Sequence, residues 1–227
     1  MERFLNQEEV TLGKHKMEEI INEVKKEAKE YFKEACPSHD WNHIERVYNL
    51  ALKIAKKENA DLFIVKLAAL LHDIGIKQED EFNKTEYHSA ISIKIAQMIL
   101  HKYKISHEIM DKVLSCISTH KFRNDKVKKT IEAKVLFDAD KLDCIGAIGV
   151  ARAYTWAGER KIKLYSEKTF FETNYEKKHS PIIEFSFKLT KIKDEMQTKT
   201  GKKIATSRHK YTIKYFKELK REITNKI

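Results

Sequence analysis

The chain has 227 residues, 41% of them hydrophobic, and carries a formal net charge of +11 from 45 Lys and Arg against 34 Asp and Glu. This size allows one good-sized domain with its own core, and no apolar run approaches the roughly 18 residues that a membrane span needs, so no membrane partner is expected. The three cysteines are odd in number and widely spaced, which argues against a disulfide framework and favours a protein of the reducing cytoplasm.

Nothing in the composition marks a boundary between domains, because the chain has only 6 Gly and 2 Pro and no Ser/Gly-rich tract. We therefore expect a single domain over residues 1–227, with a motif-bearing core at about 38–155, an irregular segment at about 158–180 and C-terminal helices at about 182–225. The basic excess predicts attraction to phosphates, although lysines scattered in pairs favour a solvated surface over a dedicated polyanion site.

The first part of the chain predicts helices and no strands. Lys, Glu, Ala, Ile and Leu are abundant, and apolar residues recur at spacings of three and four, which indicates an all-α fold. A first helix is expected at about 16–34, and Pro37 breaks the chain after it. Asp40 is placed to cap a second helix, on whose apolar face His43 lies.

The middle of the chain predicts three more helices, each with a histidine on or beside its apolar stripe. The third, at about 62–74, is apolar nearly all round, as a central helix should be, and Gly75 is placed to end it. His72 falls in line with the apolar residues of that helix. A fourth helix begins near His88, and a fifth reaches His120 through an apolar face.

A sixth helix is expected at about 131–154, with Asp140 on the same face as several apolar residues, so that its carboxylate points inward. The segment from 158 to 180 loses periodicity and mixes lysines with aromatic residues, which predicts a lid-like loop. After Pro181 helical spacing resumes to the C-terminus. The chain as a whole is expected to form a compact multi-helix bundle.

Six titratable side chains stand at or near the ends of apolar faces: His43, His72, Asp73, His88, His120 and Asp140. A single buried histidine is usually a core residue satisfied by hydrogen bonds. Burying all six groups separately would cost on the order of several kcal/mol apiece, so a shared cation explains the pattern better. Imidazoles and carboxylates together suit Mn²⁺, Fe²⁺, Zn²⁺ or Co²⁺, with coordination positions left for water and substrate.

The order of these motifs resembles the HD-domain superfamily of metal-dependent phosphohydrolases. The stretches SHDWNHIERV, LAALLHDIG, HSAISIKIA, DADKLDCIGAIGVARAY and MQTKTGKKIATSRH resemble one compact branch of predicted HD hydrolases, over roughly residues 38–209. In that family a histidine, an adjacent His-Asp pair and a distant aspartate hold one metal, which implies His43, His72, Asp73 and Asp140 here. The resemblance also implies a nucleotide substrate and Mn²⁺, with Fe²⁺, Co²⁺, Zn²⁺, Ni²⁺ or Mg²⁺ as alternatives.

Three of these residues are also assigned to the reaction itself. Asp73, or another carboxylate near the metal, is expected to orient the attacking water, while His88 and His120 are expected to bind phosphate or to protonate the leaving group. Alternatively, the two histidines only hydrogen-bond the ligands or complete a second metal site. Ile76 and Lys77 stand where many HD nucleotidases carry an acidic residue, so the general base is left unassigned.

Basic residues that recur in the resembling sequences are expected to bind the phosphates: Arg46, Lys77, Lys141, Lys188 and Arg208. Arg46 and Arg208 are equally compatible with structural ion pairs. Asp138 and Asp143 are expected to cap or support their neighbours rather than to bind metal. The chain departs from the branch at 184–189, where it reads EFSFKL in place of the frequent HFYEKL.

These features favour a divalent-metal-dependent phosphohydrolase that acts on a nucleotide phosphate or pyrophosphate bond. One alternative is an HD-type phosphodiesterase acting on cyclic or polymeric nucleotides, and another is a non-catalytic, basic helical module that binds nucleic acid. The lysines lack the interleaved aromatic residues of a stacking platform, so the nucleic-acid partner is favoured less. A di-iron oxygenase needs more ligands than this motif supplies. Apolar faces on the terminal helices are compatible with a monomer or a homodimer.

Overall fold

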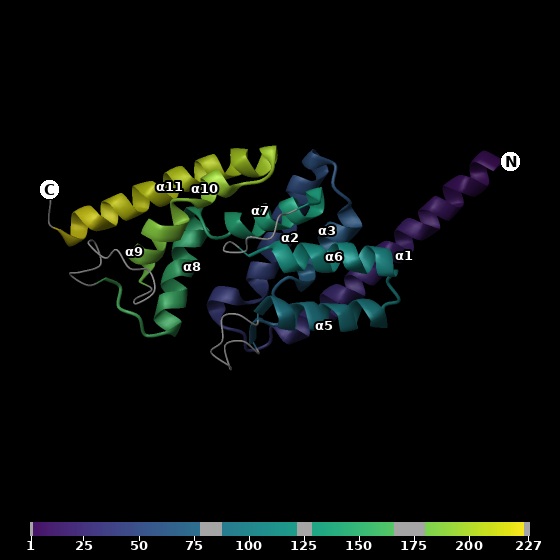
Figure 1. The fold of residues 1–227 in the computed structure, drawn as a ribbon, viewed down its shortest axis with the longest axis horizontal. Helices are drawn as coiled ribbons and strands as arrows, with labels where there is room; N and C mark the ends of the chain where they lie inside the picture. The colour runs from purple at the N-terminus through teal and green to yellow at the C-terminus, as the bar shows by residue number, and fades with distance from the viewer. Residues whose placement is uncertain (1, 78–87, 122–128, 166–179, 225–227) are drawn as a thin grey trace.

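The computed structural model describes the chain except residues 1, 78–87, 122–128, 166–179 and 225–227, and except the side chains of 2–12, 88 and 89. Within the described residues all regular structure is helical and no strand occurs, so the all-α prediction is confirmed (Figure 1). The α-helices are α1 (Glu2–Tyr31), α2 (Trp41–Glu58), α3 (Leu62–Leu71), α5 (His88–Lys102), α6 (His107–Thr119), α7 (Ile131–Leu142), α8 (Gly146–Glu159), α9 (Pro181–Glu184), α10 (Ile192–Glu195) and α11 (Lys199–Ile223). A 3-10 turn, η1 (Pro37–His39), precedes α2, and a short π-helical stretch, η2 (Phe185–Leu189), follows α9.

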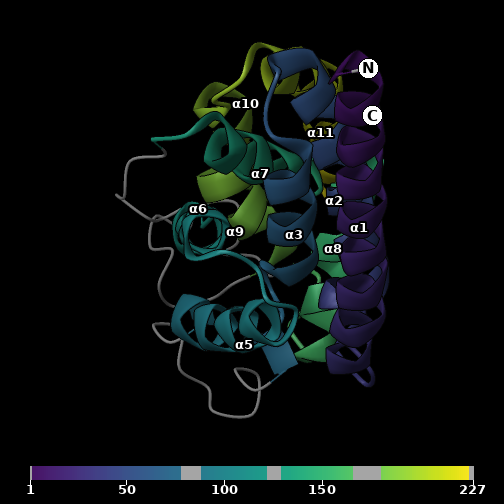
Figure 2. The ribbon, with the colours of Figure 1, turned by 90° about the vertical axis from the view of Figure 1, so that its right-hand side faces the viewer.

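Helix α3 is central, as its sequence predicts. It packs against α1, α2, α6 and α7, and Figure 2 shows it between α1 and α6. Seven of its residues are buried, on all sides of the helix, which matches a helix surrounded by others. Asp61 caps its first turn by accepting hydrogen bonds from the backbone N–H groups of Phe63 and Ile64. The helix ends at Leu71, and His72 to Gly75 form the turn that follows.

Helix α2 packs against both α3 and α7, and its start agrees with the predicted cap. The Asp40 carboxylate accepts a hydrogen bond from the backbone N–H of His43 at 3.1 Å. The apolar face is buried through Ile44, Val47 and Ile54. Because His43 lies at the head of this face, the packing of α2 fixes where the imidazole stands.

The prediction of one helix over 131–154 is wrong, because the chain breaks between α7 and α8. Gly146 has a φ of +82°, a conformation that favours glycine, and its N–H donates to Thr212 Oγ1 at 2.8 Å. A Cβ at this position would lie 3.1 Å from Arg208 Cγ. The break leaves Asp143 at the end of α7, pointing into the protein and fully buried.

The C-terminal part is less continuous than a resumed helix. Pro181 begins α9 as expected, with Ser180 as its cap, but η2 and α10 interrupt the path to α11. Helix α11 is held to α7 by Asp138, whose buried carboxylate accepts the backbone N–H groups of Gln197 and Thr198 and the Thr198 hydroxyl at 2.7–2.8 Å. Most of the predicted lid-like loop lies outside the described residues.

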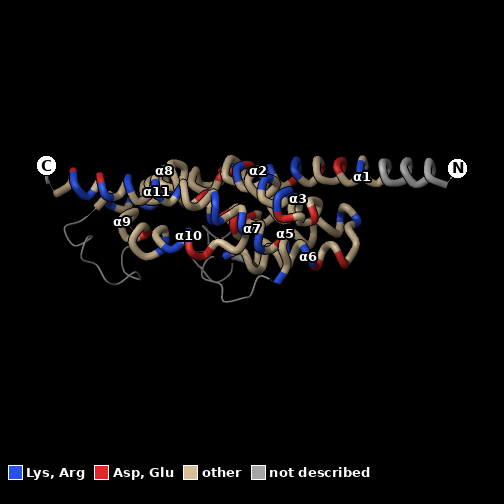
Figure 3. The backbone as a smooth tube through the Cα atoms, turned by 90° about the horizontal axis from the view of Figure 1, so that it is seen from above, with Lys and Arg blue, Asp and Glu red and all other residues tan. Residues whose placement is uncertain are grey.

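The basic residues are spread over the molecule. Figure 3 shows Lys and Arg along the helices from α1 to α11, interspersed with Asp and Glu. This distribution agrees with the expectation of a solvated charged surface. Among the described helices, none combines the length with the apolar character that crossing a membrane requires.

Candidate metal centre and active site

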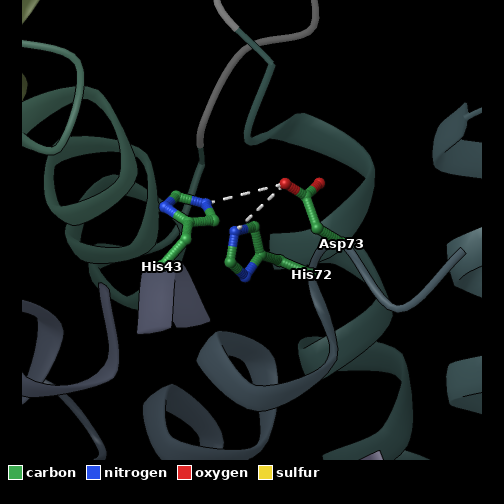
Figure 4. Close-up of side chains that lie close together, drawn as sticks. All are labelled: His43, His72 and Asp73. Carbon is green, nitrogen blue, oxygen red and sulfur yellow. Dashed lines mark ion pairs between the residues drawn. The ribbon is translucent and has the colours of Figure 1, made fainter. Parts of the chain in front are cut away.

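Three side chains of the HD motif converge on one point. His43 from α2, and His72 and Asp73 from the turn after α3, place one ligand atom each within 4.8 Å of one another. Figure 4 shows both imidazoles facing the same Asp73 oxygen, Oδ2, which lies 3.7 Å from His43 Nε2 and 3.6 Å from His72 Nε2. Both Nε2 atoms are buried and have no hydrogen-bond partner. Leaving two such nitrogens unsatisfied is costly, and a cation at this point would satisfy them.

Asp140 borders this cluster from α7. Its Oδ1 lies 3.7 Å from His43 Nε2, and its Oδ2 accepts a hydrogen bond from Lys141 Nζ at 2.6 Å. Burial alone would raise the pKa of Asp140, but the charges of Lys141 and of the histidines hold it below its usual range. The carboxylate is therefore ionised at neutral pH and available to a cation.

Asp73 is also ionised. Burial opposes this, but the charge of His72 and the nearby rings of His120 and His43 hold its pKa well below the usual value. Its second oxygen, Oδ1, lies 3.3 Å from His120 Nε2. The predicted site residue His120 is thus brought to the cluster, at the end of α6. His88 begins α5, but its side chain lies outside the described residues.

The backbone fixes the tautomers of two histidines. Nδ1 of His72 lies 2.9 Å from the carbonyl oxygen of Ala69, and Nδ1 of His120 lies 2.6 Å from that of Ile117. A carbonyl only accepts hydrogen bonds, so both Nδ1 atoms carry the proton. In the neutral ring the lone pair is then on Nε2, which faces Asp73. Burial lowers the pKa of His72 to about 4, so this ring is neutral at pH 7.

Asp143 fixes the third histidine. It accepts hydrogen bonds from His43 Nδ1 at 2.8 Å, from Arg46 Nε at 2.8 Å and from Arg152 Nη1 at 3.0 Å. Burial alone would raise the pKa of this carboxyl, but the bonds from His43 and Arg46 hold it below its usual range. Asp143 therefore supports a neighbour, as predicted, and Arg46 stands in the structural ion pair that the sequence left open. Arg152 was not predicted.

The other predicted phosphate-binding residues differ in their distance from the cluster. Arg208 Nη1 donates to the carbonyl of Leu142 at 2.6 Å, close to Asp143. Lys141 contacts Asp140 directly. Lys77 and Lys188 pair instead with Glu34 and Glu184, at 3.1 and 2.7 Å.

Two residues near the cluster were missed by sequence reasoning. Lys121 is half-buried next to His120, and burial lowers its pKa to about 8 although the charge of Asp73 acts in the opposite direction. His39, in η1, contacts the ring of His43 edge-on, and burial together with the charge of Arg152 lowers its pKa to about 3. Helical periodicity gave no signal for His39, because this residue lies in η1, before the Asp40 cap of α2.

The chain is similar to a known family and to known proteins. A family model described as HD domain matches residues 40–145. The uncharacterized protein YpgQ of Bacillus subtilis is 36% identical over 190 residues, which cover 82% of this chain and 84% of that protein.

Solved structures extend the likeness. The crystal structure of B. subtilis YpgQ in complex with ADP aligns with a TM-score of 0.70 and 34% identity, over 89% of this chain and 97% of that one. A structure from Bacillus thuringiensis, described as an HD-superfamily hydrolase, aligns with a TM-score of 0.69 and 28% identity, over 92% and 98% of the two chains. The His72–Asp73 pair lies inside the matched residues 40–145, and the similar proteins cover most of the chain. The chain therefore belongs to the HD-domain superfamily of hydrolases.

Proposed function

We propose that this protein is a divalent-metal-dependent phosphohydrolase that cleaves a phosphate or pyrophosphate bond of a nucleotide. The observation that carries the proposal is the pair of buried, unpartnered Nε2 atoms of His43 and His72 beside the ionised carboxylate of Asp73. This donor set, with Asp140 at its border, fits a divalent cation that prefers mixed nitrogen and oxygen ligands, with Mn²⁺ as the first candidate. A bound ion of this kind polarises a phosphate oxygen and lowers the pKa of a coordinated water, from about 15.7 to about 7 for Zn²⁺.

The protein's own groups have distinct roles in this proposal. Asp73 Oδ2 faces the imidazoles of His43 and His72, and Asp73 Oδ1 faces His120. Because His120 Nδ1 donates to a carbonyl, a proton on Nε2 makes the ring a donor toward Asp73 and the space beside it. We assign His120 as the group that holds a proton for the leaving oxygen.

Cations beside the carboxylates favour a phosphate substrate. Lys141 Nζ lies 2.6 Å from Asp140, and Lys121 is close enough for the charges of Asp73 and Asp140 to affect it. A polyphosphate needs such counter-charges, and they stabilise the charge that develops in phosphoryl transfer. The ADP complex of YpgQ supports a nucleotide as the molecule that carries the phosphates.

The test is the release of phosphate and of pyrophosphate from a panel of ribo- and deoxynucleotides with Mn²⁺, Co²⁺, Mg²⁺ or Zn²⁺. Wild type, Asp73→Ala and Asp111→Ala are compared, since Asp111 is an exposed aspartate on α6. We expect metal-dependent turnover in wild type and Asp111→Ala and none in Asp73→Ala. Full activity of metal-free Asp73→Ala would overturn the proposal.

A second candidate is an HD-type phosphodiesterase on cyclic or polymeric nucleotides. The net charge of +11 favours it, because a basic protein attracts polyanions. Inactivity on the mononucleotide panel, combined with metal-dependent cleavage of a cyclic dinucleotide or an oligonucleotide, would select this candidate.

A further inference from the structure

Four imidazoles stand in a row at the candidate site. The ring centroids of His39 and His43 are 6.0 Å apart, those of His43 and His72 are 5.5 Å apart, and those of His72 and His120 are 5.3 Å apart. Each pair meets edge-on. His39 is the outermost member and is half-buried, whereas the other three are buried. The row therefore runs from the protein interior toward solvent.

A hydrogen-bonded relay fixes the tautomer of His39. The Ser38 hydroxyl lies 2.7 Å from Glu159 Oε2, and the Ser38 backbone N–H donates to Glu159 Oε1 at 2.7 Å. A hydroxyl has one proton and a carboxylate only accepts, so Ser38 donates to Glu159. The same hydroxyl oxygen, 2.9 Å from His39 Nδ1, must then accept a hydrogen bond from the ring N–H. Nε2 of His39 therefore carries the lone pair.

Hydrogen bonds link the turn that carries His39 to Asp143, the residue that orients His43. Arg152 on α8 donates from Nε to the carbonyl of Ser38 at 2.9 Å and from Nη1 to Asp143 at 3.0 Å. One arginine thus holds both η1 and the carboxylate that orients His43. These hydrogen bonds hold the His39 ring beside the cluster, whereas an ordinary surface histidine has no such support.

Nε2 of His39 has no hydrogen-bond partner among the described residues, and it is not sealed from solvent. The three side chains whose ligand atoms meet within 4.8 Å do not include His39. It therefore stands outside the set that fits a cation, yet near enough for the charges of Asp73 and Asp140 to affect it. A hydrogen-bond acceptor beside the cluster, but outside the set of ligand atoms, suits a water molecule at the edge of the cluster.

We propose that His39 is a further catalytic residue, whose Nε2 accepts a hydrogen bond from the attacking water and directs the water's oxygen at phosphorus. In the reaction this oxygen bonds to phosphorus, the bond from phosphorus to the leaving oxygen breaks, and one water proton passes to solvent. His39 orients the water and keeps no proton. The inference rests on the proposed function, because it needs a hydrolytic water.

The experiment uses two substitutions that separate the ring nitrogens. In His39→Asn the amide nitrogen takes the place of Nδ1 and bonds Ser38, while the acceptor at Nε2 is lost. In His39→Gln the amide oxygen reaches the position of Nε2. We expect kcat of His39→Asn to fall about 100-fold, with KM, Mn²⁺ affinity and Tm unchanged, and His39→Gln to recover part of kcat. An unchanged kcat, or weakened Mn²⁺ binding in His39→Asn, would overturn the proposal.

A measurement that does not depend on turnover separates this inference from the proposed function. Nitrogen-15 NMR of the imidazoles at neutral pH should show His39 protonated at Nδ1 in wild type and lose that preference in Ser38→Ala. A proton on Nε2 in wild type would contradict the inference even if the enzyme turns over nucleotides. Absence of wild-type turnover on every phosphate substrate would refute the proposed function, and the role of His39 with it.

Discussion

His43 Nδ1 lies 2.8 Å from a carboxylate oxygen of Asp143, across 100 residues of sequence. The contact joins the start of α2 to the end of α7. Because a carboxylate only accepts, the proton stays on Nδ1, and Nε2 of His43 is directed at Asp73 and Asp140. The orientation of the imidazole is thus set by the other side of the ring.

Asp143→Asn should weaken Mn²⁺ binding about 10- to 100-fold, the usual effect of removing a partner that orients a metal-binding histidine. The amide keeps the size of the carboxyl but loses the charge shared by His43 and Arg46. Calorimetric titration with Mn²⁺ measures the change. Asp138→Asn is the matched control, since Asp138 is equally buried in α7 but bonds the start of α11. Equal Mn²⁺ affinity in the Asp143 variant and wild type would contradict the argument.

The sequence predicts the candidate metal ligands better than the residues that hydrogen-bond and orient them, and the reason is physical. His43, His72 and Asp140 lie on apolar faces, so helical periodicity alone points them inward, and the structure brings them together. Asp143 was predicted only as a supporting residue, because Asp140 is the aspartate on the apolar face. The apolar spacing continues past Asp143 and hides the break at Gly146.

Residues that approach the cluster only through tertiary packing gave no periodic signal. Arg152 and Glu159 lie on α8 and meet η1 across more than a hundred residues of chain. Lys121 reaches the carboxylates from just beyond the end of α6. The fold class was predictable because composition and periodicity act locally, whereas these contacts depend on how the helices cross.

A bound ion should raise the thermal stability of the protein. Binding to the folded state alone stabilises it by about 2.7 kcal/mol when the ligand concentration is 100 times Kd. We expect Tm to rise with Mn²⁺ concentration and to fall on addition of a chelator, as measured by differential scanning fluorimetry. Asp73→Ala should lose this dependence and Asp111→Ala should keep it. A wild-type Tm that is independent of Mn²⁺ concentration would argue against a metal at the cluster.

Mn²⁺ affinity should depend on pH through His43. Burial and the charge of Arg152 lower the pKa of this ring, but the hydrogen bond that it donates to Asp143 and the nearby carboxylates of Asp73 and Asp140 outweigh them and raise it above its usual value. A proton on Nε2 competes with a metal, so affinity should be constant above that pKa and fall about tenfold per pH unit below it. His72, with a pKa of about 4, adds a second loss only near that pH. Titrations from pH 5 to 8 test this, and a flat profile would refute it.

Lys121→Met should raise KM for a nucleotide by roughly 10- to 100-fold, because a hydrogen bond to a charged group contributes about 1.5–3 kcal/mol. The methionine keeps the apolar length of the side chain and removes the ammonium. Steady-state kinetics with Mn²⁺ gives the comparison. Lys94→Met on the exposed face of α5 is the control and should leave KM unchanged. If the two variants share one KM, Lys121 does not bind substrate.

Gly201→Ala should destabilise the fold by about 1–3 kcal/mol. A Cβ at Gly201 would lie 2.1 Å from Asp138 Oδ2, the carboxylate that anchors the start of α11. Gly158→Ala is the matched control, because nothing lies within 4 Å of a Cβ at that position. Alanine in place of glycine in a helix should raise the free energy of unfolding by about 0.5–1 kcal/mol. Urea unfolding measures both variants, and equal stabilities would show that the α11 anchor tolerates displacement.

Arg152, which bonds both the carbonyl of Ser38 and the carboxylate of Asp143, lies beyond residues 40–145, where the HD family model matches. Glu159, the end of the relay to His39, lies further still. A fragment that stops at residue 145 would keep all four candidate metal ligands and lose both of these groups. We therefore expect that the HD segment of this chain cannot carry out the proposed reaction without α8.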